Sequence, residues 1–423
     1  MLEIAQEQAQ YFMELEDKYG AHNYHPIPVV LSKGKGVFVW DVNGKRYYDF
    51  LSAYSAVNQG HCHPRLVKAM TDQVQRLTLT SRAFYNDRLG LLEQKMSEMF
   101  GFDKVLPMNS GAEAVETALK LCRKWAYKKK GLPENQAKII FARNNFHGRT
   151  LTIISASTDP SATTNYGPYM PGMVLVDYND LESMKAALED EMVAGVIIEP
   201  IQGEAGIVVP NDGYLKQVRD WCKEKNVLFI ADEVQTGIAR TGKLLAVCGN
   251  CSCGKKCEKD FEIKPDVLIL GKALSGGMMP VSAVLANDDV MLVIEPGTHG
   301  STYGGNPLAC AVALEALNIV EDEDLAGNAQ RLGVIFRREM QKLVDRSDLV
   351  VKVRGKGLLN ALVINDSEEG DKAWNICVRL KENGLLAKPT HGNIIRFAPP
   401  LVMTEEQVME CCKIITDTIL SFE

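Results

Sequence analysis

The middle of the chain alternates short apolar runs with longer amphipathic segments. The apolar runs, which are typical of buried strands, lie at residues 137–142, 193–200, 227–233 and 266–272. Between them, residues 112–130 and 213–226 carry apolar side chains at intervals of three and four, which predicts helices. Strands that alternate with helices in this way favour an α/β fold built on a mostly parallel sheet of about seven strands.

The two ends of the chain differ from this middle part. Residues 1–54 include VFVWDVNGKRYYDF, which predicts a hairpin turning at Asn43 and Gly44, so we expect an arm or small sheet there. From about residue 311 the pattern changes to helix, glycine-punctuated strands, then helix, strand and helix. We therefore predict a large domain over 55–312 and a smaller α+β domain over 313–423.

Composition narrows the possible partners. The 423 residues are 46% hydrophobic and 24% charged, and 47 basic side chains against 54 acidic ones give a net charge of −7. Without a basic block, nucleic acid and anionic membrane surfaces are not expected partners. The apolar runs are far shorter than the roughly 20 residues that span a bilayer. The acidic first 20 residues resemble neither a signal peptide nor a transit peptide, so we predict a cytoplasmic location.

Four of the eleven cysteines crowd into CGNCSCGKKC, an apparent insertion over 248–258. Cys248, Cys251, Cys253 and Cys257 could form a tetrahedral zinc site, although their spacing is tighter than in a standard zinc finger. Local disulfides or free thiols are the alternatives, and a reducing cytosol disfavours disulfides. The other cysteines lie mostly in apolar segments and are expected to be reduced.

Two charged side chains follow predicted strands and suggest chemistry. Asp232 ends VLFIADE and Lys272 ends DVLILGK, where parallel strands usually present their ligand-binding edge. Each could belong to a structural ion pair, because an unpaired buried charge is expensive. Together they allow a sharper hypothesis. A lysine in a dry pocket can form a Schiff base with an aldehyde, and an aspartate can hold a pyridinium nitrogen, as pyridoxal 5′-phosphate (PLP) requires.

Such a cofactor also needs an anion-binding turn. Ser110, Gly111 and Ala112 lie where a loop becomes a strong helix, and free backbone N–H groups at that end would favour a phosphate. Ser110 followed by Glu113 is equally the pattern of an ordinary capping box. A second candidate turn is GTHGSTYGGNP, which contains Ser301 and Thr302.

The order of these segments resembles a known family. MNSGAEAVETALK, NNFHGRT, IIEPIQGEAG, LFIADEVQTGIARTGK, DVLILGKALSGG and GSTYGGNP follow one another as in the class III, fold-type I PLP aminotransferases. Within that class, KYGAHNYHPIPVVL, DFLSAYSAVNQGHCHP, SRAFYN and IIRFAPPL are similar to the ornithine aminotransferases. The resemblance covers residues 18 to 420, interrupted mainly by the cysteine-rich stretch.

The resemblance implies a set of cofactor-binding roles. Lys272 would carry the Schiff base and Asp232 would pair with the pyridine nitrogen. Phe146 would stack on the ring, unless it is only a core aromatic, and Gln235 would contact the phenolic oxygen. The phosphate would be bound by Ser110, Gly111 and Ala112, and by Ser301 and Thr302 of the other subunit in a homodimer.

Substrate roles follow from the same resemblance. Tyr24 and Arg149 would hold the α-amino and α-carboxylate groups of L-ornithine, and Tyr54 would line the pocket. Glu204 would pair with Arg396, masking it while ornithine reacts and freeing it for 2-oxoglutarate. Without the family, both could be ordinary surface charges.

The implied reaction is a ping-pong transfer of the δ-amino group from ornithine to 2-oxoglutarate, giving glutamate 5-semialdehyde and glutamate. Acetylornithine and 4-aminobutyrate are alternative donors. A zinc-binding interaction protein on an inactive aminotransferase fold is a rival hypothesis. His147 would either adjust the polarity near the cofactor or only pack, and packing is favoured. His61 and His63 of GHCHP resemble a metal pair, but the segment is structural in this family, so no metal is assigned there.

Overall fold

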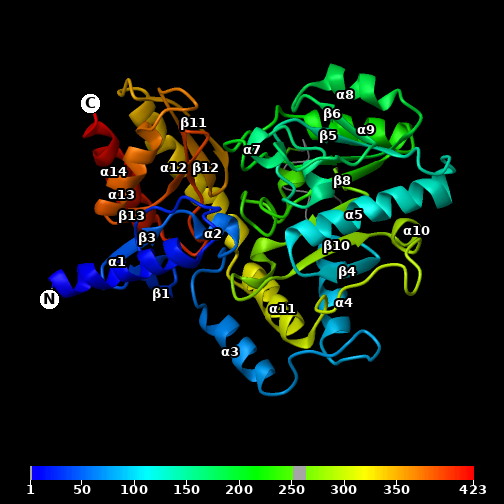
Figure 1. Cartoon of the computed structure of the whole chain (residues 1–423), viewed down its shortest axis with the longest axis horizontal. Coiled ribbons are helices and arrows are strands. Elements are labelled where there is room, and N and C mark those ends of the chain that lie inside the picture. Colours follow the sequence, from blue (N-terminus) through cyan, green and yellow to red (C-terminus); the bar gives the residue numbers. More distant parts are fainter. Residues whose placement is uncertain (1, 251–262) are drawn as a thin grey trace.

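The computed structural model describes residues 2–250 and 263–423. Its largest layer is a seven-stranded sheet in the order β4-β10-β9-β8-β7-β5-β6 (Figure 1). The strands are β4 (Lys104–Met108), β5 (Lys138–Ala142), β6 (Met173–Val176), β7 (Val193–Ile198), β8 (Leu228–Asp232), β9 (Val267–Leu270) and β10 (Ser282–Ala286). β10 is antiparallel to both of its neighbours, whereas the other pairs are parallel. The predicted, mostly parallel sheet is confirmed.

Helices cover both faces of this sheet because alternate strand residues point to opposite sides. In β8, the fully buried Ile230 belongs to the core beneath α5 (Gly111–Trp125). The next residue toward the N-terminus, Phe229, belongs to the core on the opposite face, with α8 (Leu181–Leu188) and α9 (Tyr214–Glu224). Strands buried on both sides carry continuous apolar runs, which is why the sequence pattern revealed them.

Shorter helices connect or flank these layers. They are α3 (Pro64–Val74), α4 (Leu89–Phe100), the π-helical turn η1 (Ala126–Lys130), α6 (Leu151–Ile154), α7 (Pro160–Thr163), the 3₁₀ turns η2 (Ala246–Asn250) and η4 (Lys272–Ser275), and α10 (Asp288–Met291). In the part of the chain that the structure describes, no helix is both long enough and apolar enough to cross a membrane.

The C-terminal part forms a second, antiparallel sheet in the order β11-β12-β15-β14. Its strands are β11 (Val350–Lys356), β12 (Leu359–Ile364), β14 (Lys388–Thr390) and β15 (Ile394–Phe397). Its helices are α12 (Leu325–Val344), α13 (Lys372–Glu382) and α14 (Glu405–Leu420). The predicted domain boundary at 312–313 falls inside α11 (Pro307–Asp322), so one helix runs through it. The three-part division remains a prediction.

The N-terminal segment contributes a third sheet, in the order β1-β2-β3-β13. The N-terminal segment contains the helices and strands α1 (Leu2–Tyr19), β1 (Leu31–Lys35), β2 (Phe38–Asp41), β3 (Arg46–Asp49) and α2 (Ser52–Ser55). The hairpin between β2 and β3 is confirmed, with Gly44 at φ +83° in its turn. β3 pairs in parallel with β13 (Leu385–Leu386), so the N-terminal segment and the C-terminal part share one sheet (Figure 1).

The structure bears differently on the two groups of residues that resemble metal ligands, the cysteine cluster and the histidines of GHCHP. Cys248 is buried, but Cys251, Cys253 and Cys257 lie outside the described residues, so the zinc hypothesis stays a prediction. His61 Nε2 lies 2.7 Å from Asp49 Oδ2, and His63 Nε2 lies 3.0 Å from Glu323 Oε1. Each histidine therefore has its own carboxylate partner. Within residues 2–250 and 263–423, no group of three metal-binding side chains comes together.

Candidate active site

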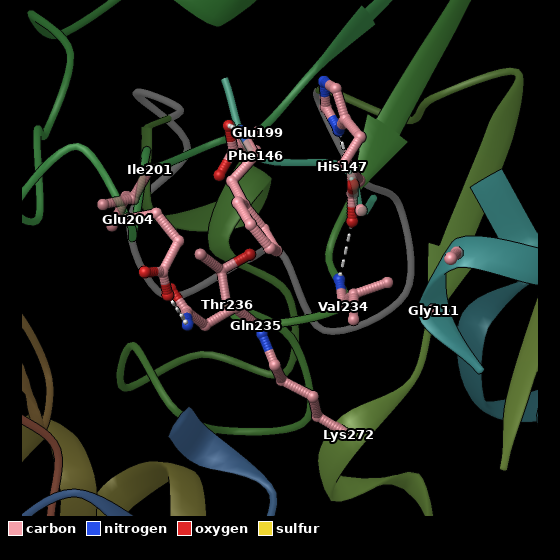
Figure 2. A pocket seen from close by; sticks show the side chains of 13 residues that line it. Gly111, Phe146, His147, Glu199, Ile201, Glu204, Val234, Gln235, Thr236 and Lys272 are labelled. Carbon is pink, nitrogen blue, oxygen red and sulfur yellow. Dashed lines mark hydrogen bonds and ion pairs between the residues drawn. The ribbon is translucent and has the colours of Figure 1, made fainter. Parts of the chain in front are cut away.

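A cavity of about 670 Å³ opens at the carboxyl edge of the seven-stranded sheet. Its walls come from the segments that follow β4, β5, β7, β8 and β9, so residues far apart in the sequence meet there (Figure 2). The lining residues are Gly111, Ala112, Phe146, His147, Gly148, Glu199, Ile201, Glu204, Asp232, Val234, Gln235, Thr236 and Lys272.

Lys272 extends into this cavity from the turn after β9 (Figure 2). Burial lowers the pKa of its amine, although the negative charges of Glu204 and Asp232 oppose that shift. Its backbone has φ +42°, a left-handed conformation that costs a non-glycine residue about 1–3 kcal/mol. A strained backbone that holds an amine with a lowered pKa is typical of a reactive lysine.

Asp232, the last residue of β8, is paired with His147. The Nδ1 of His147 lies 2.6 Å from Asp232 Oδ2, and the backbone N–H of Val234 donates to Asp232 Oδ1 at 3.1 Å (Figure 2). Burial by itself would lower the pKa of His147, but the hydrogen bond and the charge of Asp232 outweigh it and raise this pKa. The structure thus favours the polar interpretation of His147 over simple packing.

Phe146 and Gln235 line the same cavity as Lys272 (Figure 2). The backbone N–H of Phe146 donates to Glu199 Oε2 at 3.0 Å, which fixes the turn that carries its ring. The Nε2 of Gln235 donates to Glu204 Oε1 at 3.4 Å. A Cβ at Gly203 would lie only 1.4 Å from Gln235 Oε1, so a larger residue there would displace the Gln235 amide from its present position.

The predicted phosphate turn lies at the N-terminus of α5. Gly111 and Ala112 line the cavity, whereas Ser110 caps the helix: its Oγ accepts from the backbone N–H of Glu113 at 3.1 Å. The capping-box interpretation is therefore confirmed. Ser301 and Thr302 do not line the cavity of their own chain. Ser301 instead accepts from Asn109 Nδ2 at 2.9 Å.

Glu204 and Arg396 form an ion pair, with Arg396 Nη1 2.6 Å from Glu204 Oε1. Burial would raise the pKa of Glu204, but the charge and hydrogen bond of Arg396 lower it overall. The Arg396 guanidinium also lies 5.0 Å from the centre of the Tyr54 ring. Tyr54 thus contacts the Glu204–Arg396 pair, but neither Tyr54 nor Arg396 is among the residues that line the cavity. Both side chains of the ion pair are largely buried, so neither is an ordinary surface charge.

Tyr24 and Arg149 do not line the cavity. Arg149 is exposed, lies 5.4 Å from the centre of the Phe146 ring and pairs with Asp159 at 3.6 Å. Tyr24 is 70% exposed, with Lys388 Nζ 5.9 Å from its ring centre. Lys388 lies directly opposite Arg396 in the antiparallel pairing of β14 and β15. Tyr24, which contacts Lys388, therefore lies on the Arg396 side of the site.

Glu199, which follows β7 and lies beside Phe146, was not predicted from the sequence. Burial raises the pKa of Glu199 to about 7, while the charge of His147 lowers it. Glu199 follows an apolar strand just as Asp232 does, and this signal could have identified it. Thr236 also lines the cavity without having been expected there.

Comparisons with known proteins agree with this geometry. A family model described as aminotransferase class-III matches residues 19–419. A protein named ornithine aminotransferase, mitochondrial, from Drosophila melanogaster is 62% identical, covering 96% of this chain and 90% of its own length. The solved acetylornithine aminotransferase of Elizabethkingia anophelis is 59% identical with a TM-score of 0.88, covering 98% of this chain and 99% of that one. The ornithine aminotransferase of Toxoplasma gondii, whose structure has partial PLP occupancy at its active site, is 49% identical with a TM-score of 0.93, covering 98% and 94%.

Proposed function

Because the chain belongs to the class-III aminotransferases, we propose that it transfers the δ-amino group of L-ornithine to 2-oxoglutarate, giving glutamate 5-semialdehyde and glutamate. The ion pair between Glu204 and Arg396 carries this proposal, because a maskable arginine lets one pocket accept first a diamino acid and then a dicarboxylate. Relatives named ornithine aminotransferase, at 62% and 57% identity over nearly the whole chain, support the same substrate.

The residues around the cavity fit PLP. Lys272 supplies a buried amine, Asp232 a carboxylate held by His147, and Gly111 and Ala112 a helix end suited to a phosphate. Phe146 supplies an aromatic face, and Gln235 an amide that could contact a phenolic oxygen. When bound, PLP supplies an aldehyde that accepts the amine and a ring that withdraws electrons from the reacting carbon.

Lys272 would hold the cofactor and then act as the acid and base. Since burial lowers the pKa of its amine, a larger share is unprotonated near neutral pH than in water. A free Nζ in the cavity would take a proton from the δ-carbon of ornithine and deliver it to the C4′ carbon of PLP. Asp232, fixed by His147, would keep a ring nitrogen protonated throughout.

Glu204 and Arg396 would select between the two substrates. While Glu204 and Arg396 are paired, Arg396 would not attract the carboxylate of ornithine. Arg149, which lies near Phe146, would bind that α-carboxylate instead. Tyr24 would bind the α-amino group. During the second half-reaction, Arg396 would separate from Glu204 and bind a carboxylate of 2-oxoglutarate through its fork of N–H groups. Tyr54, against the Arg396 guanidinium, would line this part of the pocket.

A homodimer would complete the site. Ser301 and Thr302 lie outside their own chain's cavity, and Thr302 is exposed. We expect them to reach the phosphate bound by a second copy. Analytical ultracentrifugation of the wild type should give a dimer, and Thr302→Ala should weaken PLP retention. A monomer with full activity would contradict this arrangement.

The main alternative is transfer from N-acetylornithine, since the relative from Elizabethkingia anophelis carries that name. A panel of L-ornithine, N-acetylornithine and 4-aminobutyrate, each with 2-oxoglutarate, separates the candidates through the glutamate formed. We expect ornithine to have the highest kcat/KM and to give ping-pong kinetics. Preference for N-acetylornithine would overturn the assignment. The cytoplasmic location stays a prediction, and the mitochondrial names of several relatives do not support it.

A further inference from the structure

A second cleft, separate from the PLP cavity, lies where β11 of the C-terminal sheet meets the loop that follows β7. It has a volume of about 380 Å³ and is open to solvent. Its lining residues are Val208, Val209, Arg337, Lys352, Val353, Arg354 and Gly355. Three of these seven are cations, and no acidic residue lines the cleft in the part of the chain that the structure describes. This concentration of positive charge contrasts with the net charge of −7 of the whole chain.

The two arginines are held in place without being neutralised. Arg337 Nη1 donates to the carbonyl of Gly357 at 3.0 Å and to Asn360 Oδ1 at 2.9 Å. Arg354 Nε donates to the carbonyl of Gly206 at 2.8 Å. All three acceptors are uncharged. Across residues 2–250 and 263–423, no ion pair involves Arg337, Lys352 or Arg354.

Such an arrangement suits an anion. Burial lowers the pKa of both Arg337 and Arg354, with no carboxylate to offset that cost. Arginine nevertheless stays protonated in proteins, so the charge remains and would gain from an oxyanion that restores a partner. The N–H groups that Arg337 and Arg354 do not use in these bonds form planar forks matched to phosphate oxygens, while the exposed Lys352 adds a point charge.

We propose that this cleft binds a small, multivalent phosphate anion. Pyrophosphate is the simplest member of this class, and a nucleoside diphosphate would present the same diphosphate group. The site does not depend on the transamination chemistry, because none of its cations lines the cavity that contains Lys272. Arg354 does contact Gly206, two residues after Glu204, so Lys352 is the cleaner position for a test.

Calorimetric titration of pyrophosphate into PLP-saturated protein, in low-salt buffer free of phosphate and sulfate, tests the proposal. Saturation with PLP fills the competing phosphate position at α5. The wild type should bind one pyrophosphate per chain, and Lys352→Gln should weaken binding about threefold or more, because one of three local charges is lost. Lys372→Gln is the matched control. It removes an exposed lysine of the same domain that donates only to a backbone carbonyl, and it should bind like the wild type.

Adenosine diphosphate in a parallel titration distinguishes a free diphosphate from a nucleotide ligand, since equal affinity means that the phosphates suffice. Lys352→Gln should keep wild-type ornithine turnover in the anion-free buffer, which separates this test from the proposed reaction. Absence of binding heat in the wild type would overturn the proposal. So would equal pyrophosphate affinity of Lys352→Gln and Lys372→Gln.

Discussion

Glu204 accepts a hydrogen bond from Arg396 at 2.6 Å, which joins the loop after β7 to strand β15, 192 residues further along the chain. The pair lies beside Lys272, whose amine experiences both charges. One ion pair therefore connects the C-terminal sheet to the reactive lysine of the large sheet, and it can be tested through substrate choice.

Replacing Glu204 by alanine leaves Arg396 permanently available to carboxylates. Ornithine would then bind in a second orientation that presents its α-amine, while glutamate would bind more easily. We expect the ratio of kcat/KM for glutamate to that for ornithine to rise about tenfold, which corresponds to about 1.4 kcal/mol. Half-reaction kinetics with each amino donor measure this ratio.

The exposed Glu189, which pairs with Lys225, provides the control for that experiment. Glu189→Ala should leave the ratio unchanged. If Glu204→Ala also leaves it unchanged, the ion pair does not select between the substrates.

His147→Phe keeps an aromatic ring at this position but removes the hydrogen bond to Asp232. Breaking a buried charged pair costs about 3–5 kcal/mol, because the remaining carboxylate has lost its partner. We expect His147→Phe to have a lower melting temperature and to lose PLP faster during dialysis. The PLP that remains bound is measured by its absorbance. His147→Gln, which restores a donor, should recover part of both. A Phe variant that melts and retains PLP like the wild type would show that His147 only packs.

Glu233 should make stability depend on pH. It is fully buried and accepts from Thr236 Oγ1 at 2.5 Å and from the backbone N–H of Val247 at 2.9 Å. Burial raises the pKa of Glu233 from 4.5 to about 7, although these hydrogen bonds oppose the shift. Between these two values the folded state binds more protons than the unfolded state, so stability falls as the pH rises.

The loss attributable to Glu233 amounts to about 3 kcal/mol between pH 4.5 and 7. Glu233→Gln stays neutral and can still accept from Val247, so its stability should fall less over that range. Urea unfolding midpoints at pH 5 and pH 7.5 measure the difference. If the midpoints of the wild type and of Glu233→Gln fell by the same amount between these two pH values, Glu233 would not be the cause of the pH dependence.

Arg240 links three separate segments from a completely buried position. Its Nη1 donates to the carbonyls of Leu358 at 3.0 Å and Pro399 at 2.6 Å, and its Nη2 donates to Asn58 Oδ1 at 2.5 Å. Burial lowers the pKa of Arg240 to about 9. Arg240→Ala would leave a cavity and three buried acceptors without a donor, and each unsatisfied acceptor costs about 1–3 kcal/mol.

We therefore expect Arg240→Ala to lose at least about 3 kcal/mol of unfolding free energy, measured by urea titration. Arg338→Ala, which removes an exposed arginine, should change stability by less than about 1 kcal/mol. Similar losses in the two variants would argue against the linking role of Arg240.

The central strands and the residues that follow them can be identified from the amino-acid sequence alone. Strands buried on both faces carry continuous apolar runs, so the positions of Asp232 and Lys272 directly after such runs place them at the sheet edge. The order of the motifs likewise indicates the family. Short strands such as β10 and β13 were not identified, because few residues define their pattern and their partners are distant in the sequence.

The assembly of the site, in contrast, depends on tertiary packing. Packing pairs His147 with Asp232, brings Glu199 to Phe146 and keeps Tyr24 and Arg149 outside the cavity lining. It also gathers the cations of the second cleft from α12 and β11. Local patterns report which side chains are buried, but contacts between distant segments depend on how the sheets and helices pack together.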